Sequence, residues 1–100
     1  MRALKHPKAS EFVLERVLYA LSDPVRMEII CRLDSMAEAT CGELDGGRPK
    51  SSVSHHFRVL RDAGLMRTRT VGTTHMNSLR KDELERRFPG LLDSILSHST

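Results

Sequence analysis

The sequence lacks the features that would place it in a membrane or among disulfide-stabilised secreted domains. No apolar run approaches the roughly twenty residues that a transmembrane helix needs. The N-terminal residues are basic but lead to no apolar stretch with a small-residue cleavage site, so we expect no signal peptide and a cytosolic protein. The two cysteines, Cys31 and Cys41, are too few for a disulfide framework and show no CxxC spacing.

The motifs of common catalytic sites are missing as well. We find no nucleophile elbow, no phosphate-cradling glycine loop and no HExxH pair. An acidic cluster is present at Asp82, Glu83 and Glu85, but these residues begin a predicted helix, where acids complement the helix dipole, and Arg86 and Arg87 lie close by. The sequence therefore predicts a protein that is not an enzyme and needs no metal or cofactor.

The length and composition predict one folded domain spanning residues 1–100. The chain has 100 residues, of which 39% are hydrophobic, and no internal repeats or low-complexity segments. A chain of this size buries only a modest core, so domains of this kind often share a core through dimerisation.

Charge is unevenly distributed along the chain. Residues 21–47 carry two basic and six acidic side chains, whereas residues 48–72 carry six basic and one acidic. A basic stripe on a small domain is an electrostatic footprint for a polyanion, although a solvated basic face is an equally valid interpretation of charge alone.

Hydrophobic periodicity predicts two helices in the first third of the chain. The first covers residues 10–21 with Ser10 as its N-cap, and the second covers 24–34 with Asp23 as N-cap and Pro24 at its first position. In the first helix Val13, Leu14, Val17, Leu18 and Leu21 form a wide apolar stripe, and in the second we expect Val25, Ile29, Ile30 and Leu33 to face inward.

A short helix and a longer one follow. Thr40 and Glu43 have the spacing of a capping box, which opens a short helix that Gly46 and Gly47 end. The next helix covers residues 49–63, packs through Val53, Phe57 and Leu60, and ends at Gly64 as its C-cap. Its opposite face presents Lys50, Ser51, Ser52, Ser54, His55, Arg58 and Arg61.

After Gly64 the sequence is rich in threonine, and polar and apolar residues partly alternate. This pattern predicts a β-hairpin that turns at Gly72, with Arg67 and Arg69 on one face of its first strand. Two helices, over 81–87 and 91–97, complete the chain, and the last is strongly apolar. The predicted fold is mainly α with a small β-hairpin wing, a winged helix-turn-helix.

The outer face of the 49–63 helix and the wing together are suited to duplex DNA. Arginine and lysine reach phosphates or guanine edges, and serine and histidine hydrogen-bond bases or phosphates. We expect Lys50, Ser51, Ser52, Ser54, His55 and Arg58 to meet the groove, and Arg61, Arg67 and Arg69 to hold phosphates. The alternative is a winged helix that uses the same face to bind a protein.

The adjacent histidines and the two cysteines each allow a sharper interpretation. His55 and His56 point about 100° apart on a helix, so they do not share one metal. His55 faces out, and His56 lies near the core edge, where it orients or packs the helix.

We interpret Cys31 and Cys41 as small buried hydrophobic residues. A thiol or redox sensor that uses both is the alternative, because Cys41 lies near a helix N-terminus.

The segments "LSDPVRMEIICRL", "TCGEL" and "SSVSHHFRVLRDAGLMRTRTVGT" resemble the ArsR/SmtB family of bacterial winged helix-turn-helix repressors over roughly residues 14–80. The resemblance implies a homodimer built from the first and last helices, an imperfectly palindromic operator, and an inducer that releases the protein. Metal-sensing members carry a Cys-x-Cys pair where this chain has Thr40 and Gly42, and a ligand set along the last helix where it has only Asp82, Asp93 and His98. The family's metal sensing is therefore not expected here.

Overall fold

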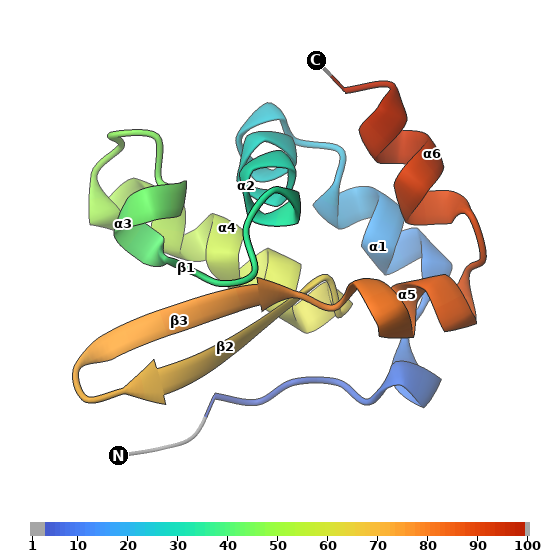
Figure 1. Cartoon of the computed structure of the whole chain (residues 1–100), viewed down its shortest axis with the longest axis horizontal. Helices are drawn as coiled ribbons and strands as arrows, with labels where there is room; N and C mark the ends of the chain where they lie inside the picture. Colours follow the sequence, from blue (N-terminus) through green and yellow to red (C-terminus); the bar gives the residue numbers. More distant parts are fainter. Residues whose placement is uncertain (1–3, 100) are drawn as a thin grey trace.

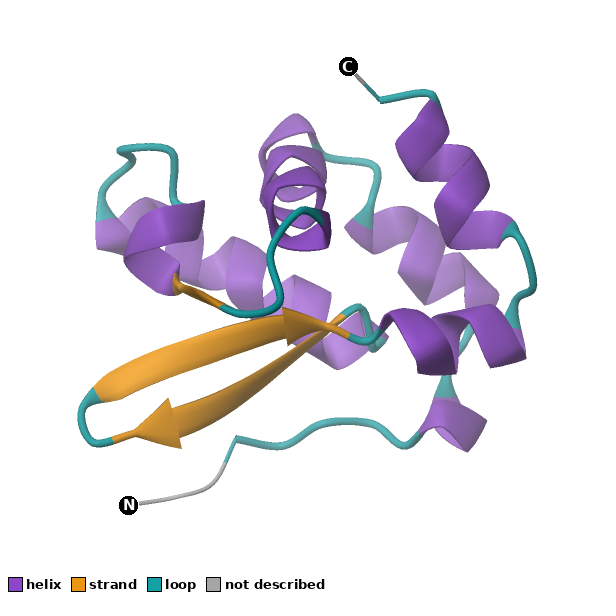
Figure 2. Ribbon diagram, in the orientation of Figure 1, coloured by secondary structure: helices purple, strands orange, loops and turns teal. Residues whose placement is uncertain are grey.

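A computed structural model describes residues 4–99 of the chain as a mainly helical protein with one small antiparallel sheet (Figures 1 and 2). The predicted fold class is confirmed. In chain order the elements are η1 (Ala9–Glu11), α1 (Leu14–Ala20), α2 (Pro24–Asp34), β1 (Ala39–Thr40), α3 (Cys41–Leu44), α4 (Lys50–Ala63), β2 (Met66–Val71), β3 (Thr74–Leu79), α5 (Lys81–Arg87) and α6 (Leu91–Ser97).

The prediction of one helix over 10–21, capped by Ser10, is wrong. The chain forms a single 3₁₀ turn, η1, runs extended through Phe12 and Val13, and begins α1 only at Leu14. Phe12 causes the interruption, because its ring is 3% exposed and packs against the α-carbon of Gly64, where a Cβ atom would lie 2.3 Å from the ring. An extended backbone at Phe12 is what turns this ring into the core.

Both predicted caps of the next helices are confirmed. Asp23 accepts hydrogen bonds from the backbone N–H groups of Val25 and Arg26 at 2.8 and 3.2 Å, and Pro24 occupies the first turn of α2. The hydroxyl of Thr40 accepts from the N–H of Glu43 at 3.2 Å, while the Glu43 carboxylate accepts from the N–H of Thr40 at 2.8 Å. These reciprocal bonds fix the entry to α3.

The α4 helix and the wing also form as predicted. Val53, Phe57 and Leu60 are buried, and Gly64 ends α4 in the left-handed conformation at φ +91°. The strands β2 and β3 pair antiparallel from Met66 opposite Leu79 to Val71 opposite Thr74, around a turn at Gly72 and Thr73. In Figure 1 the hairpin passes below α3 and α4, and its turn lies at the end of the molecule opposite α5 and α6.

Strand β1 was not predicted. Ala39 and Thr40 pair with Asn77 and Met76, so the sheet has the order β1-β3-β2. Asn77 is fully buried at this junction; its amide donates to the Ala39 carbonyl at 3.1 Å, and its carbonyl accepts from the Thr68 hydroxyl at 2.6 Å. This side-chain bridge ties the wing to the segment that leads into α3.

Helices α5 and α6 have the predicted bounds. They pack with α1 through apolar side chains of the three helices, of the residues that follow α1 and α5, and of Leu65 after α4. These side chains are Val17, Leu21, Leu65, Leu84, Phe88, Leu91, Leu92 and Ile95. Figure 1 shows α6 beside α1, on the side of the molecule away from the hairpin turn. No helix among residues 4–99 is both long and apolar enough to cross a membrane.

Candidate nucleic-acid interface

The exposed face of α4 carries the polar residues expected there. Lys50, Ser51, Ser52, Ser54, His55 and Arg58 are all exposed. Two of the serine hydroxyls donate to backbone carbonyls of the same helix, from Ser52 to Pro49 at 2.9 Å and from Ser54 to Ser51 at 3.5 Å. The side chain of Arg58 has no hydrogen bond or ion pair within the described part of the chain, so its guanidinium is available to an external acceptor.

The N-terminus of α4 is open to an anion. Pro49 is the N-cap, and proline supplies no side-chain acceptor to the first-turn N–H groups. The free N–H groups and the positive end of the dipole of a fourteen-residue helix favour a phosphate, and Lys50 adds a formal charge at the same end. The N-terminus of α4 is therefore suited to binding an anion.

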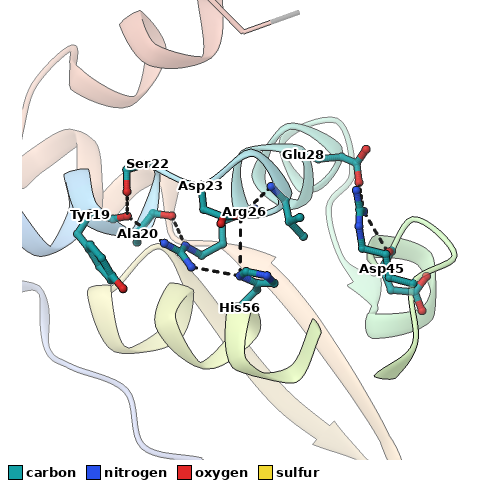
Figure 3. A network of polar contacts seen from close by, with 10 residues as sticks. Tyr19, Ala20, Ser22, Asp23, Arg26, Glu28, Asp45 and His56 are labelled. Carbon is teal, nitrogen blue, oxygen red and sulfur yellow. Dashed lines mark hydrogen bonds and ion pairs between the residues drawn. The ribbon is translucent and has the colours of Figure 1, made fainter. Parts of the chain in front are cut away.

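His55 and His56 lie on different sides of α4. His55 is exposed, whereas His56 is half-buried and places its Nδ1 atom 3.1 Å from Nη1 of Arg26 and 3.9 Å from a carboxylate oxygen of Asp23 (Figure 3). Because the arginine only donates, Nδ1 of a neutral His56 is the acceptor in this hydrogen bond. The side chain of His56 therefore links α4 to the start of α2.

Arg26 connects three helices and was missed by the sequence analysis. Its side chain is 5% exposed; Nε donates to the Ala20 carbonyl at 2.7 Å and Nη2 to the Tyr19 carbonyl at 3.2 Å, at the end of α1 (Figure 3). Its third contact is with His56. The helical spacing does place Arg26 on the buried stripe of α2, because it lies three and four residues before Ile29 and Ile30.

The wing arginines are exposed but already paired with acids. Arg69 donates to both oxygens of Glu38 at 2.8 Å, and Arg67 donates to Glu83 at 3.2 Å. The hydrogen bonds from Arg69 hold the pKa of Glu38 below its usual range, and the same bonds raise the pKa of Arg69. A phosphate that contacts either arginine must compete with a carboxylate, which sequence reasoning did not anticipate.

Arg61 differs from the other residues of the α4 face. It is half-buried and lines a groove of about 470 Å³ between α3, α4 and the tip of the wing, together with Cys41, Val53, Phe57 and His75. Burial lowers the pKa of its guanidinium. Arg61 thus lies at the edge of the exposed face of α4, with its side chain against this groove.

Glu83 anchors the base of the wing. Its carboxylate accepts two hydrogen bonds from the buried Arg80, at 2.8 and 2.9 Å, and one from Arg67. The bonds from Arg80 are the main reason that the pKa of Glu83 falls from 4.5 to about 2.

We expect Glu83→Gln to lower the free energy of unfolding at pH 7 by about 1–3 kcal/mol, because the lowered carboxylate pKa reflects stabilisation of the charged form. The contribution is complete above the unfolded-state pKa of 4.5 and is lost as the pH falls towards the folded-state value of about 2. Urea unfolding of both proteins at pH 7 and pH 3 measures the change. A difference in stability that stays constant with pH, or that equals the effect of Asp82→Asn on the same helix, would contradict this role.

The two cysteines are free thiols in different surroundings. The Cys31 sulfur lies 3.0 Å from the hydroxyl of Ser99, and the Cys41 sulfur accepts from the Asn77 amide at 3.4 Å. Both are half-buried, so the expectation of small buried hydrophobes holds only in part, and thiol sensing by the two remains a prediction. No group of three or more His, Cys, Asp or Glu side chains within residues 4–99 could hold a metal ion.

A helix pair, α3 and α4, with a polar outer face on the second helix and a hairpin directly after it, defines a winged helix-turn-helix protein. Residues 21–69 match the family model of a helix-turn-helix domain. This stretch begins just before α2 and ends inside β2, so it contains the whole of α3 and α4.

Similar proteins narrow the class to one family. The chain is 35% identical over 91 residues to the HTH-type transcriptional regulator YceK of Bacillus subtilis, covering 88% of this chain and 91% of the relative. It is 34% identical over 73 residues to an arsenical resistance operon repressor of Staphylococcus xylosus, covering 72% and 70%. A solved structure of an ArsR family transcriptional regulator superposes over 96% of this chain and 100% of its own, with a TM-score of 0.65 and 22% identity, and supports the fold. This chain belongs to the ArsR/SmtB family of winged-helix transcriptional regulators.

Proposed function

We propose that the protein is a cytosolic repressor that binds a palindromic operator as a homodimer and is released by a small-molecule inducer. It acts by binding rather than by catalysis, and residues 1–100 form one domain with dimerisation helices at both ends, of which residues 1–3 and 100 lie outside the described structure. The observation that carries the proposal is the exposed face of α4, where Arg58 has no partner among the described residues and no side chain of the N-cap, Pro49, caps the helix. Family membership favours this function over a protein-interaction module.

An electrophoretic mobility shift with DNA that flanks the protein's own gene tests the proposal. We expect a shift at low salt that weakens steeply as salt rises, because neutralised phosphates release counterions. Operator binding that required an intact Arg58 would support α4 as the contact surface. The absence of any shift at low salt would contradict the proposal.

The dimer is proposed from apolar side chains that α1 leaves uncovered. Val13, Leu14, Leu18 and Tyr19 are exposed hydrophobics on or beside α1, and half-buried Leu91, Ile95 and Leu96 lie on the neighbouring α6. An apolar surface of this kind on a small domain marks an interface. A second copy of the chain buries the same residues when the two-fold axis passes by these helices.

We expect Leu18→Glu to convert the protein from a dimer to a monomer, because a carboxylate at a position 45% exposed in the single chain would be buried in the dimer. Size-exclusion chromatography with light scattering measures the mass. Val71→Glu is the matched control, since Val71 is 48% exposed but lies at the tip of the wing. A Leu18→Glu protein that remained dimeric would contradict the proposed interface.

A further inference from the structure

The chain before α1 forms an arm, residues 4–12, whose first residues lie beside the outer strand of the wing and whose 3₁₀ turn, η1, packs on α5. Strand β2 is the edge of the sheet, so one side of its backbone has no neighbouring strand. The ring Nε2 of His6 accepts a hydrogen bond from the backbone N–H of Thr68 at 3.0 Å. Figure 1 shows this segment running beside β2 towards the turn of the hairpin.

The arm is held at its other end by buried groups. The guanidinium of Arg80, 5% exposed, donates to the Pro7 carbonyl at 2.7 Å and lies 4.8 Å from the centre of the Phe12 ring. Glu83 fixes the same guanidinium from the other side through two hydrogen bonds. Because Phe12 packs on Gly64, the arm is attached both to the wing and to the end of α4.

The hydrogen bond between His6 and Thr68 requires a neutral imidazole at Nε2. Burial, followed by the charges of Arg67, Arg80 and Arg61, lowers the pKa of His6. The ring therefore keeps its acceptor lone pair at neutral pH, which preserves the hydrogen bond that attaches the arm to β2.

The arm carries two lysines beside β2 that form no ion pair with the described residues. Lys5 and Lys8 are exposed, and neither forms an ion pair with any residue from 4 to 99. Glu11 is the first acid of the chain, and its carboxylate accepts the backbone N–H of Lys8. By contrast, the exposed cations of β2 itself, Arg67 and Arg69, are each paired with a carboxylate.

We propose that the arm is a DNA-contacting element, in which Lys5 and Lys8 bind backbone phosphates beside the wing while His6 holds the arm in place. The proposal rests on the proposed function, since α4 supplies the main contact with the duplex. A polyanion with regularly spaced phosphates fits two lysines on an extended segment, because each lysine neutralises one phosphate as a point charge. Attaching the arm to β2 removes part of the ordering cost that a free arm would pay on binding.

Fluorescence anisotropy with a labelled operator duplex, titrated over a series of salt concentrations, tests the charges. We expect the double variant Lys5→Gln, Lys8→Gln to raise Kd on the order of ten-fold at physiological salt, and to reduce the log-log salt slope by about 0.9 for each lysine. The matched control, Arg86→Gln with Arg87→Gln, makes the same change in net charge on α5, outside the arm. Equal Kd values and slopes for the two double variants would overturn the proposal.

A second variant distinguishes the hydrogen bond between His6 and Thr68 from the charges of Lys5 and Lys8. His6→Ala keeps both lysines, so we expect Kd to rise a few-fold with the salt slope unchanged, and the amide of Thr68 to exchange with solvent faster. If Thr68 exchanged faster while Kd stayed at the wild-type value, the arm would only cover the edge of β2 and the proposal would fail. If neither value changed, His6 would not hold the arm, and the proposal would fail as well.

The two hypotheses fail in distinguishable ways. Loss of binding in Arg58→Ala with no effect of the lysine variants would contradict the arm alone. Failure of the wild-type protein to bind duplex DNA would contradict the proposed function.

Discussion

Arg58→Ala is expected to weaken operator binding by one to two orders of magnitude at physiological salt. Arg58 is exposed on α4, one turn beyond Ser54, and has no partner among residues 4–99. A well-placed arginine contact with a guanine edge contributes about 1–3 kcal/mol of discrimination. Anisotropy with the operator and with an unrelated duplex measures both affinity and specificity.

The pattern of loss identifies the kind of contact that Arg58 makes. If it reads a base, the affinity for the operator falls more than the affinity for unrelated DNA; if it holds a phosphate, both fall together and the salt slope decreases by about one. Arg86→Ala is the control, because this exposed arginine lies on α5. Unchanged operator affinity in Arg58→Ala would show that α4 is not the recognition helix.

Arg26→Met is expected to lower the free energy of unfolding by about 2–4 kcal/mol and to weaken DNA binding in the protein that still folds. The substitution removes a donor to the Tyr19 carbonyl and the partner of His56, and it leaves the buried Ala20 carbonyl without its arginine donor. It keeps most of the apolar stem, so the effect reports on the guanidinium. Urea unfolding measures the loss of stability. Anisotropy at a temperature well below the unfolding transition measures the loss of DNA binding.

We expect DNA binding to depend on Arg26 because the guanidinium joins the end of α1 to the inner side of α4. His56 lies on α4 immediately after His55, so a shift of the His56 side chain moves the exposed face of the same turn. Arg26→Lys is not expected to restore either property, since an ammonium on a flexible stem does not reproduce the planar fork that reaches three acceptors. Arg32→Met, at an exposed arginine of α2, serves as control. Equal effects of the Arg26 and Arg32 variants would contradict the role of Arg26.

Local signals predicted the elements that depend on neighbouring residues. Asp23 with Pro24, and Thr40 with Glu43, are caps whose acceptors and donors lie within three residues, so their spacing alone identifies the helix starts. Gly64 ends α4 and Gly72 allows the turn of the hairpin for the same reason, because each adopts a positive φ that other residues avoid. The exposed face of α4 followed from the period of its buried stripe.

The features that the sequence did not predict all depend on contacts between distant parts of the chain. Phe12 interrupts the first helix because it packs on Gly64, and β1 is only two residues long and pairs with β3 far along the sequence. The pairing of Arg67 with Glu83 and of Arg69 with Glu38 joins the wing to two other segments, and Arg61 lies in a groove formed by three elements. No periodicity within one segment reports such contacts.

Selection of bound sequences from a random duplex library with the purified protein tests most directly whether two copies of α4 read one DNA duplex. We expect an enriched site with two inverted half-sites whose centres lie about one helical turn apart, or a multiple of a turn, because two recognition helices related by a two-fold axis meet the same side of the duplex. Recovery of a single half-site with no inverted repeat, or no enrichment above the input library at low salt, would contradict it.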